Sequence, residues 1–93
     1  MTLEFYETHL AMDWDTARFY CFALNVDGKI GWRLPTKEEF SQYYSKVSSI
    51  QWYWSAEESG QQFAKSLYPY PDLVEDDTDL KTIKWSVIAV RNV

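Results

Sequence analysis

The sequence predicts one α+β domain over residues 1–93, with two helices packed on a small twisted antiparallel sheet. The first observation is the chain length, which suits a single hydrophobic core. The second is that helix-start signals occur twice in the first half of the chain, after a strand-like stretch. The third is a change to a period of two in the second half, which is typical of strands. The order strand, helix, helix and then strands is that of an α+β fold.

The first third of the chain reads as a strand followed by a helix. Residues 3–10 mix Leu, Phe, Tyr and Thr with Glu, as a half-buried strand does. Asp13 is a suitable N-cap, and Asp15 lies in the first turn, where a negative charge interacts favourably with the helix dipole. Residues 25–28, Asn-Val-Asp-Gly, form a turn that ends this helix. The apolar residues recur at helical spacing, at Trp14, Ala17, Cys21 and Leu24.

A second helix is predicted over residues 37–47. Thr36 can act as its N-cap, and Glu39, three residues later, can complete a capping box. Pro35 stands just before the cap, where its fixed φ directs the chain into the helix. One side of this helix would carry the apolar residues Phe40, Tyr43, Tyr44 and Val47.

The second half of the chain reads as three strands. Two are predicted over residues 51–55 and 63–68, with a Gly-containing turn between them. The Tyr-Pro-Tyr-Pro stretch at residues 68–71 should leave the sheet, because proline cannot donate to the ladder. An acidic loop over residues 72–79 follows, and the last strand covers residues 83–93 with alternating side chains.

Cysteine content and hydropathy indicate the compartment. Cys21 is the only cysteine, so neither an intrachain disulfide nor a multi-cysteine zinc site is expected. The first ten residues have no basic start and no apolar run, so we do not expect a signal peptide. No stretch approaches the roughly 20 apolar residues that a membrane span requires. A cytoplasmic protein without a membrane partner is therefore expected.

The charge is distributed unevenly along the chain. The formal net charge is −5, from 14 acidic and nine basic residues. Residues 57–79 hold seven of the acids but only one base, Lys65, and so carry −6, which leaves +1 for the rest of the chain. This segment should form a local negative field. Direct binding to nucleic acid is disfavoured, because phosphate contacts need clustered Lys and Arg.

Several short motifs along the chain form a recognisable set. They are residues 13–17, Cys21, Gly28, the Trp-Arg-Leu-Pro-Thr motif at 32–36, the Tyr-Trp-Ser at 53–55 and the Val-Arg at 90–91. In these motifs the chain resembles the WRLPT-type C-type-lectin-like domains, the bacterial and phage family of the collagen-like-adhesin C-terminal domain. That family is distantly related in fold to the formylglycine-generating enzyme. The resemblance implies a compact C-type-lectin-like scaffold.

Two departures from the family pattern limit what the resemblance implies. Family members often carry a cysteine in the last strand that faces the helix cysteine, and here Ala89 stands in its place. The loss of that bridge from Cys21 agrees with a cytoplasmic protein. The Glu-Pro-Asn, Gln-Pro-Asp and Trp-Asn-Asp motifs of calcium-dependent lectins are absent. The resemblance therefore implies neither a sugar site nor a calcium site.

Residues that could support catalysis or metal binding are few. Cys21 could be a nucleophile, but its place on the apolar helix face favours a buried structural thiol. His9 is the only histidine, and it has no motif linking it to Cys21. The acidic residues at 72–79 could bind calcium, although a solvated acidic loop is the commoner outcome. We therefore expect a non-enzymatic protein with no catalytic, cofactor-binding or metal-binding residues.

A partner-binding surface is predicted around the acidic segment. Tyr68 and Tyr70 each precede a proline, which restricts the backbone and leaves the isomer of each Tyr-Pro bond open. Stiffly held tyrosines beside charge are typical of a protein-binding surface. The alternative is that both rings simply cover the sheet, and the tryptophans are assigned to the core. The predicted site consists of Tyr68, Tyr70, Asp72, Glu75, Asp76, Asp77 and Asp79.

These observations predict a protein-binding module whose partner has a basic surface. A sharper form is a small acidic inhibitor from a phage or mobile element, of the anti-restriction or anti-CRISPR type, that occupies a basic surface of a host nucleic-acid-binding complex. The alternative is a lectin-like domain that binds a small molecule or a glycan without calcium. If the acidic surface is not the site, the opposite face near Lys29 and Arg33 is the next candidate.

Overall fold

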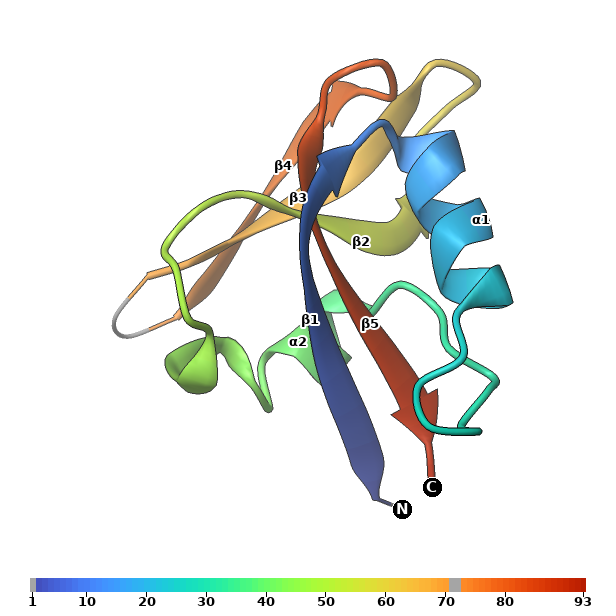
Figure 1. The fold of residues 1–93 in the computed structure, drawn as a ribbon. Coiled ribbons are helices and arrows are strands. Elements are labelled where there is room, and N and C mark those ends of the chain that lie inside the picture. The colour runs from blue at the N-terminus through green and yellow to red at the C-terminus, as the bar shows by residue number, and fades with distance from the viewer. Residues whose placement is uncertain (1, 71–72) are drawn as a thin grey trace.

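The computed structural model describes residues 2–70 and 73–93 and shows an α+β fold. A five-stranded sheet runs in the order β1-β5-β2-β3-β4, with helical segments packed on it (Figure 1). Three of the neighbouring pairs are antiparallel, but β2 and β5 are parallel, so the sheet is mixed and the predicted antiparallel sheet is wrong in this respect. The elements are β1 (Leu3–Met12), α1 (Trp14–Ala23), α2 (Lys37–Phe40), a 3₁₀ turn (Tyr44–Lys46), β2 (Tyr53–Glu58), β3 (Phe63–Pro69), β4 (Val74–Leu80) and β5 (Trp85–Asn92).

The last strand, β5, lies inside the sheet, between β1 and β2. Residues 86–90 of β5 are buried on both faces, as expected for a strand with neighbours on both sides and cover above and below. β1 lies antiparallel along one side of β5. On the other side, Ser86 is paired with Tyr53 of β2, and Val90 exchanges two backbone hydrogen bonds with Arg33. The Trp-Arg-Leu-Pro-Thr motif is therefore attached directly to the central strand.

Two buried clusters lie on the two faces of the sheet. One joins α1 to the sheet and contains both Cys21 and Ala89, which confirms the buried thiol. The other lies beneath α2, where Phe40 is fully buried. The first cluster consists of Trp14, Ala17, Cys21, Trp32, Leu34, Trp54, Ala64, Val87 and Ala89, and the second of Phe40, Tyr53, Leu67, Val74 and Ile88.

Both predicted helix starts are confirmed. Asp13 is the N-cap of α1 and accepts a hydrogen bond from the backbone N–H of Thr16. The capping box of α2 is complete, because the Thr36 hydroxyl accepts from the Glu39 N–H at 3.2 Å and the Glu39 carboxylate accepts from the Thr36 N–H at 2.9 Å. These signals are local in sequence, and the structure preserves them.

The predicted length of the second helix is wrong. α2 ends at Phe40, and the chain continues through a turn and one turn of 3₁₀ helix to Lys46. From Gln42 onward the backbone N–H groups bond to carbonyls three residues back, which tightens the spiral. The Ser41 hydroxyl also donates to the Lys37 carbonyl, and such local bonds compete with a regular helix.

The acidic segment is a strand, and its prediction as a loop is wrong. Val74–Leu80 forms β4, an edge strand paired antiparallel with β3, and its carboxylates remain near water. Charged side chains are common on edge strands because they oppose pairing with another chain. Pro69 also stays in the sheet, opposite Val74, because it is the last residue of β3, beyond the final pair with β2. The described residues contain no cis peptide bond, and Asp72 lies outside them.

Candidate functional site

Four aromatic rings form a continuous row at one end of the sheet, which we call the aromatic strip. Tyr70 contacts Tyr68, Tyr68 contacts Trp52, and Trp52 contacts Trp85. The successive ring centroids are 4.8, 5.1 and 6.1 Å apart, within the range of favourable aromatic pairs. None of the four rings is fully buried, and Tyr70 is 43% exposed. The strip is therefore continuous and partly open to solvent.

Three acidic residues of β4 share a face of the sheet with the aromatic strip. Tyr68 of β3 is directly opposite Glu75, and directly paired residues in an antiparallel ladder lie on the same face. Side chains alternate along a strand, so Asp77 and Asp79 lie on this face as well. Together with the aromatic strip, Glu75, Asp77 and Asp79 form what we call the aromatic–acidic surface.

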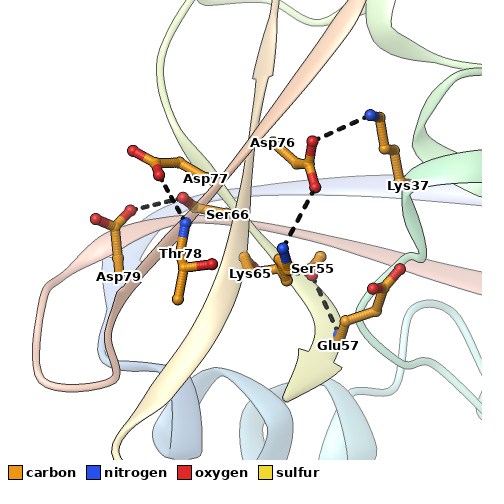
Figure 2. A network of polar contacts seen from close by, with 9 residues as sticks. All are labelled: Lys37, Ser55, Glu57, Lys65, Ser66, Asp76, Asp77, Thr78 and Asp79. Atoms are coloured by element: carbon orange, nitrogen blue, oxygen red, sulfur yellow. Dashed lines mark hydrogen bonds and ion pairs between the residues drawn. The ribbon is translucent and has the colours of Figure 1, made fainter. Parts of the chain in front are cut away.

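Asp79 joins the acidic strand to the aromatic strip. Its carboxylate accepts a hydrogen bond from the Ser66 hydroxyl at 2.6 Å and one from the Trp85 indole N–H at 3.0 Å (Figure 2 shows the Ser66 contact). Asp79 is half-buried, whereas Glu75 and Asp77 are exposed. Asp79 therefore positions the strip, and the two exposed acids are left to face solvent.

Asp76, which the sequence prediction also includes in the site, lies on the opposite face of the sheet from Glu75, Asp77 and Asp79. Figure 2 shows its carboxylate pointing toward Lys37 and Lys65, at 3.1 and 3.7 Å, away from Asp77 and Asp79. The hydrogen bond from Lys37 lowers the pKa of Asp76 below its ordinary value. Alternation along the strand separates it from its neighbours in sequence. Asp76 connects α2 to the edge of the sheet and is a structural residue.

The exposed acids can act on a positively charged group. Within residues 2–70 and 73–93, no Lys or Arg side chain makes an ion pair with Glu75 or Asp77. Among the described residues, the one hydrogen bond that Asp77 accepts comes from the neighbouring Thr78 N–H, at 2.8 Å. A guanidinium or ammonium group placed here could pair with a carboxylate and lie against an aromatic face. The surface thus suits Lys or Arg side chains of a protein.

The sequence prediction missed Trp52 and Trp85. Trp52 precedes β2, and Trp85 is the first residue of β5, so both lie where strands emerge from the core. A period-two pattern assigned Trp85 to the interior, although it is only partly buried. The available signal was the position of each ring at a strand end, next to polar residues, where one side of the ring can stay in water.

Two further potentially reactive side chains, Cys21 and His9, lie outside the aromatic–acidic surface. Burial raises the pKa of the Cys21 thiol to about 12, so the nucleophilic thiolate is scarce near neutral pH. His9 is exposed on β1 at φ 59°, beside an irregularity in the β1–β5 register. Within the described parts of the chain, no three potential metal-ligating His, Cys, Asp or Glu side chains come together. None of the helices in those parts is long and apolar enough to cross a membrane.

The surface of the described residues includes two prominent hollows. One, of about 440 Å³, adjoins the aromatic strip and is lined by Tyr44, Ser45, Val47, Ile50, Tyr68, Pro69 and Tyr70. The other, of about 760 Å³, opens between α1 and the segment from Trp32 to Glu39.

The alternative site predicted near Lys29 and Arg33 is already occupied by contacts within the chain. Lys29 pairs with Glu4 at 2.5 Å. Arg33 pairs with Glu39 at 2.6 Å and donates to Asn92 at 2.7 Å. Neither cation is free of intramolecular partners, so this face offers a partner less unpaired charge than the aromatic–acidic surface.

Comparison with known proteins adds no further candidate, because the chain matches no family model and no curated protein.

Proposed function

We propose that this chain is a non-enzymatic protein-binding module that engages a basic protein surface through the aromatic–acidic surface. The observation that supports this is the contact between a partly exposed row of four rings and a strand bearing exposed carboxylates on the same face. Tyr and Trp are enriched among the residues that dominate binding energy, and charged residues around them steer association. Tyr68 and Tyr70 are the proposed anchors, and Glu75 and Asp77 the proposed charged rim.

The finer proposal concerns the kind of partner. A basic surface on a nucleic-acid-binding complex is complementary to the −6 carried by residues 57–79. A protein bound there would compete with nucleic acid, which is the action of an anti-restriction or anti-CRISPR inhibitor. The negative charge of this segment and the aromatic strip support the proposal. The acids of β4 lie on an edge strand, which holds them in a fixed row.

We also propose that the scaffold is a C-type-lectin-like domain. In that family a helix cysteine often faces a cysteine of the last strand, and here Cys21 of α1 and Ala89 of β5 belong to one buried cluster. The Trp-Arg-Leu-Pro-Thr motif leads into a complete capping box and is bonded to β5 through Arg33. These contacts support the resemblance on the residues from which it was drawn.

The test uses two variants of equal charge. Glu75→Gln/Asp77→Asn removes both exposed acids of the surface, and Asp27→Asn/Glu38→Gln removes two exposed acids elsewhere. Bacterial lysates are passed over the immobilised wild type and both variants, and bound proteins are identified by mass spectrometry. A specific partner should be retained by the wild type and by the Asp27/Glu38 variant and lost from the Glu75/Asp77 variant. It should also be released by added DNA or RNA if the finer proposal holds.

Two results would contradict the proposal. One is a partner that binds the Glu75/Asp77 variant as well as the wild type. The other is the absence of a stoichiometric partner together with specific hits on a glycan array, which would favour the small-molecule or glycan-binding alternative.

A further inference from the structure

α1 presents two large apolar side chains to solvent. Phe19 and Phe22 are 76% and 81% exposed, and their spacing of three residues places them on the same side of the helix. Both line the 760 Å³ hollow, which we call the α1 cleft, and its wall includes the buried residues Trp32 and Leu34. Adjacent exposed rings and an apolar cleft are a combination that monomeric surfaces rarely keep without a use.

The charges around the α1 cleft balance one another. Asp15 and Arg18 on α1 lie 3.8 Å apart, and Arg33 and Glu39 across the cleft lie 2.6 Å apart. The cleft is therefore locally neutral in a chain whose net charge is −5. A basic partner is not attracted to the α1 cleft as it would be to the aromatic–acidic surface. A molecule that binds in the cleft must therefore be apolar and carry no net charge where it makes contact.

We propose that two copies of this chain associate through their α1 clefts, with Phe19 and Phe22 of each copy against the cleft of the other. A two-fold interface requires one patch that is complementary to itself, and here the protruding rings and the cleft that can receive them lie side by side. Two copies of net charge −5 repel each other on approach, and a neutral patch opposes their contact less than an acidic one does.

The inference is independent of the proposed function. α1 packs against β2 and β5, whereas β4 is the edge strand beyond β3, so the two surfaces use different parts of the sheet. A dimer would then carry two aromatic–acidic surfaces. Binding to a repeated basic target would gain avidity from the second surface without any new contact.

Sedimentation velocity over a concentration series tests the association. The wild type should form a dimer with a Kd on the order of micromolar, as small interfaces do. Phe19→Ser/Phe22→Ser should weaken the dimer by at least about tenfold while leaving the melting temperature unchanged, because both rings are already exposed. Ile50→Ser is the matched control, since Ile50 is also exposed, at 61%, but lies in the other hollow. Added salt should strengthen the dimer, because it screens the repulsion between two acidic chains.

Cross-linking locates the interface. Because Cys21 is buried, Ala23→Cys supplies a single accessible thiol beside Phe22, and Ser45→Cys supplies one away from α1. A short bismaleimide should join two copies of the Ala23→Cys protein and not of the Ser45→Cys protein. A wild type that stays monomeric up to about 1 mM would overturn the proposal. So would a dimer that persists in the Phe19/Phe22 variant or cross-links equally well from Ser45→Cys.

Discussion

At the scale of single residues, Asp79 differs from the other acids of β4 because its carboxylate is used inside the fold. It accepts hydrogen bonds from Ser66 and from the indole of Trp85, and so fixes the ring at one end of the aromatic strip. Asp77, two residues earlier on the same face, is exposed. Removing the carboxylate of Asp79 should therefore cost more stability than removing that of Asp77.

The first prediction compares these two residues. Asp79→Ala should lower the free energy of unfolding by about 1–3 kcal/mol, because Ser66 and Trp85 each lose an acceptor. Asp77→Ala should change it by less than about 0.5 kcal/mol, as is usual for an exposed site. Urea denaturation followed by tryptophan fluorescence measures both. Equal stability of the two variants would mean that Asp79 does not hold Trp85 in place.

The second prediction concerns Cys21. Burial raises its pKa to about 12, so the native thiol should react slowly with a maleimide at neutral pH and rapidly after unfolding. Cys21→Ser should destabilise the fold by about 1–3 kcal/mol, because it buries a hydroxyl without an assured partner. Because its pKa is raised in the folded state, the protonated thiol makes its full contribution to the stability of the fold below pH 9.0, the ordinary pKa. That contribution is lost as the pH rises toward about 12. Fast labelling of the native protein would contradict the buried position.

At the scale of elements, the helix caps were predictable from the sequence, whereas the strand pairings were not. The capping box of α2 was predictable because Thr36 and Glu39 are three residues apart and need no other element. β4 was not predictable as a strand, because its carboxylates are accommodated by groups distant in sequence, including Lys37, which pairs with Asp76. The parallel contact of β2 with β5 likewise depends on the long-range placement of the final strand. Local pattern carries no information about such pairings.

The third prediction uses the acid dependence of α2. Burial acts to raise the pKa of Glu39, but the hydrogen bonds from Arg33 and from the Thr36 N–H outweigh it, so the pKa is lowered. A lowered pKa means that the ionised carboxylate stabilises the fold above its ordinary pKa of 4.5 and that this stability is lost as the pH falls through the native value. Glu39→Gln should therefore be less stable than the wild type at pH 7, with the difference shrinking below about pH 4.5.

Chemical denaturation at a series of pH values measures that difference. Glu38→Gln is the control, because Glu38 is exposed on the same turn of α2. If the difference in the free energy of unfolding between the wild type and Glu39→Gln stayed constant down to about pH 3, the ionised carboxylate would not be the source of the stability.

At the scale of the whole molecule, the packing of α1 on β5 connects the first half of the chain to its end. The fourth prediction places a cysteine at Ala89, the residue that would face Cys21 in the proposed C-type-lectin-like scaffold. Ala89→Cys should form an intramolecular disulfide with Cys21 under oxidising conditions, because both positions lie in one buried cluster. A bridge that closes so long a loop should stabilise the fold by roughly 2–5 kcal/mol. Mass spectrometry and thermal unfolding with and without reductant measure this, and a protein that keeps two free thiols would contradict the proposed scaffold.

The candidate site was only partly predictable, for a reason that also belongs to this scale. Tyr68, Tyr70 and the acids of the segment stand out in the sequence by type and spacing, and the structure brings most of them to one face. Trp52 and Trp85 lie beside these residues because β2 and β5 are neighbours in the sheet, which the sequence does not reveal. Asp76 lies on the opposite face because side chains alternate along a strand, and the prediction of a loop did not include this alternation.

The last prediction separates the two parts of the aromatic–acidic surface by kinetics, once a partner is in hand. Glu75→Gln/Asp77→Asn should slow association and flatten its dependence on ionic strength, because exposed charges act mainly by steering and are screened by salt. Its melting temperature should be unchanged or raised, since neither acid makes an ion pair within the described residues. Tyr70→Ala should instead speed dissociation by about tenfold or more, because a ring that anchors a complex acts on its lifetime. Surface plasmon resonance at several salt concentrations distinguishes the two effects, with Asp27→Asn/Glu38→Gln as the charge control. If both variants kept wild-type rate constants, the partner would have to bind elsewhere on the molecule.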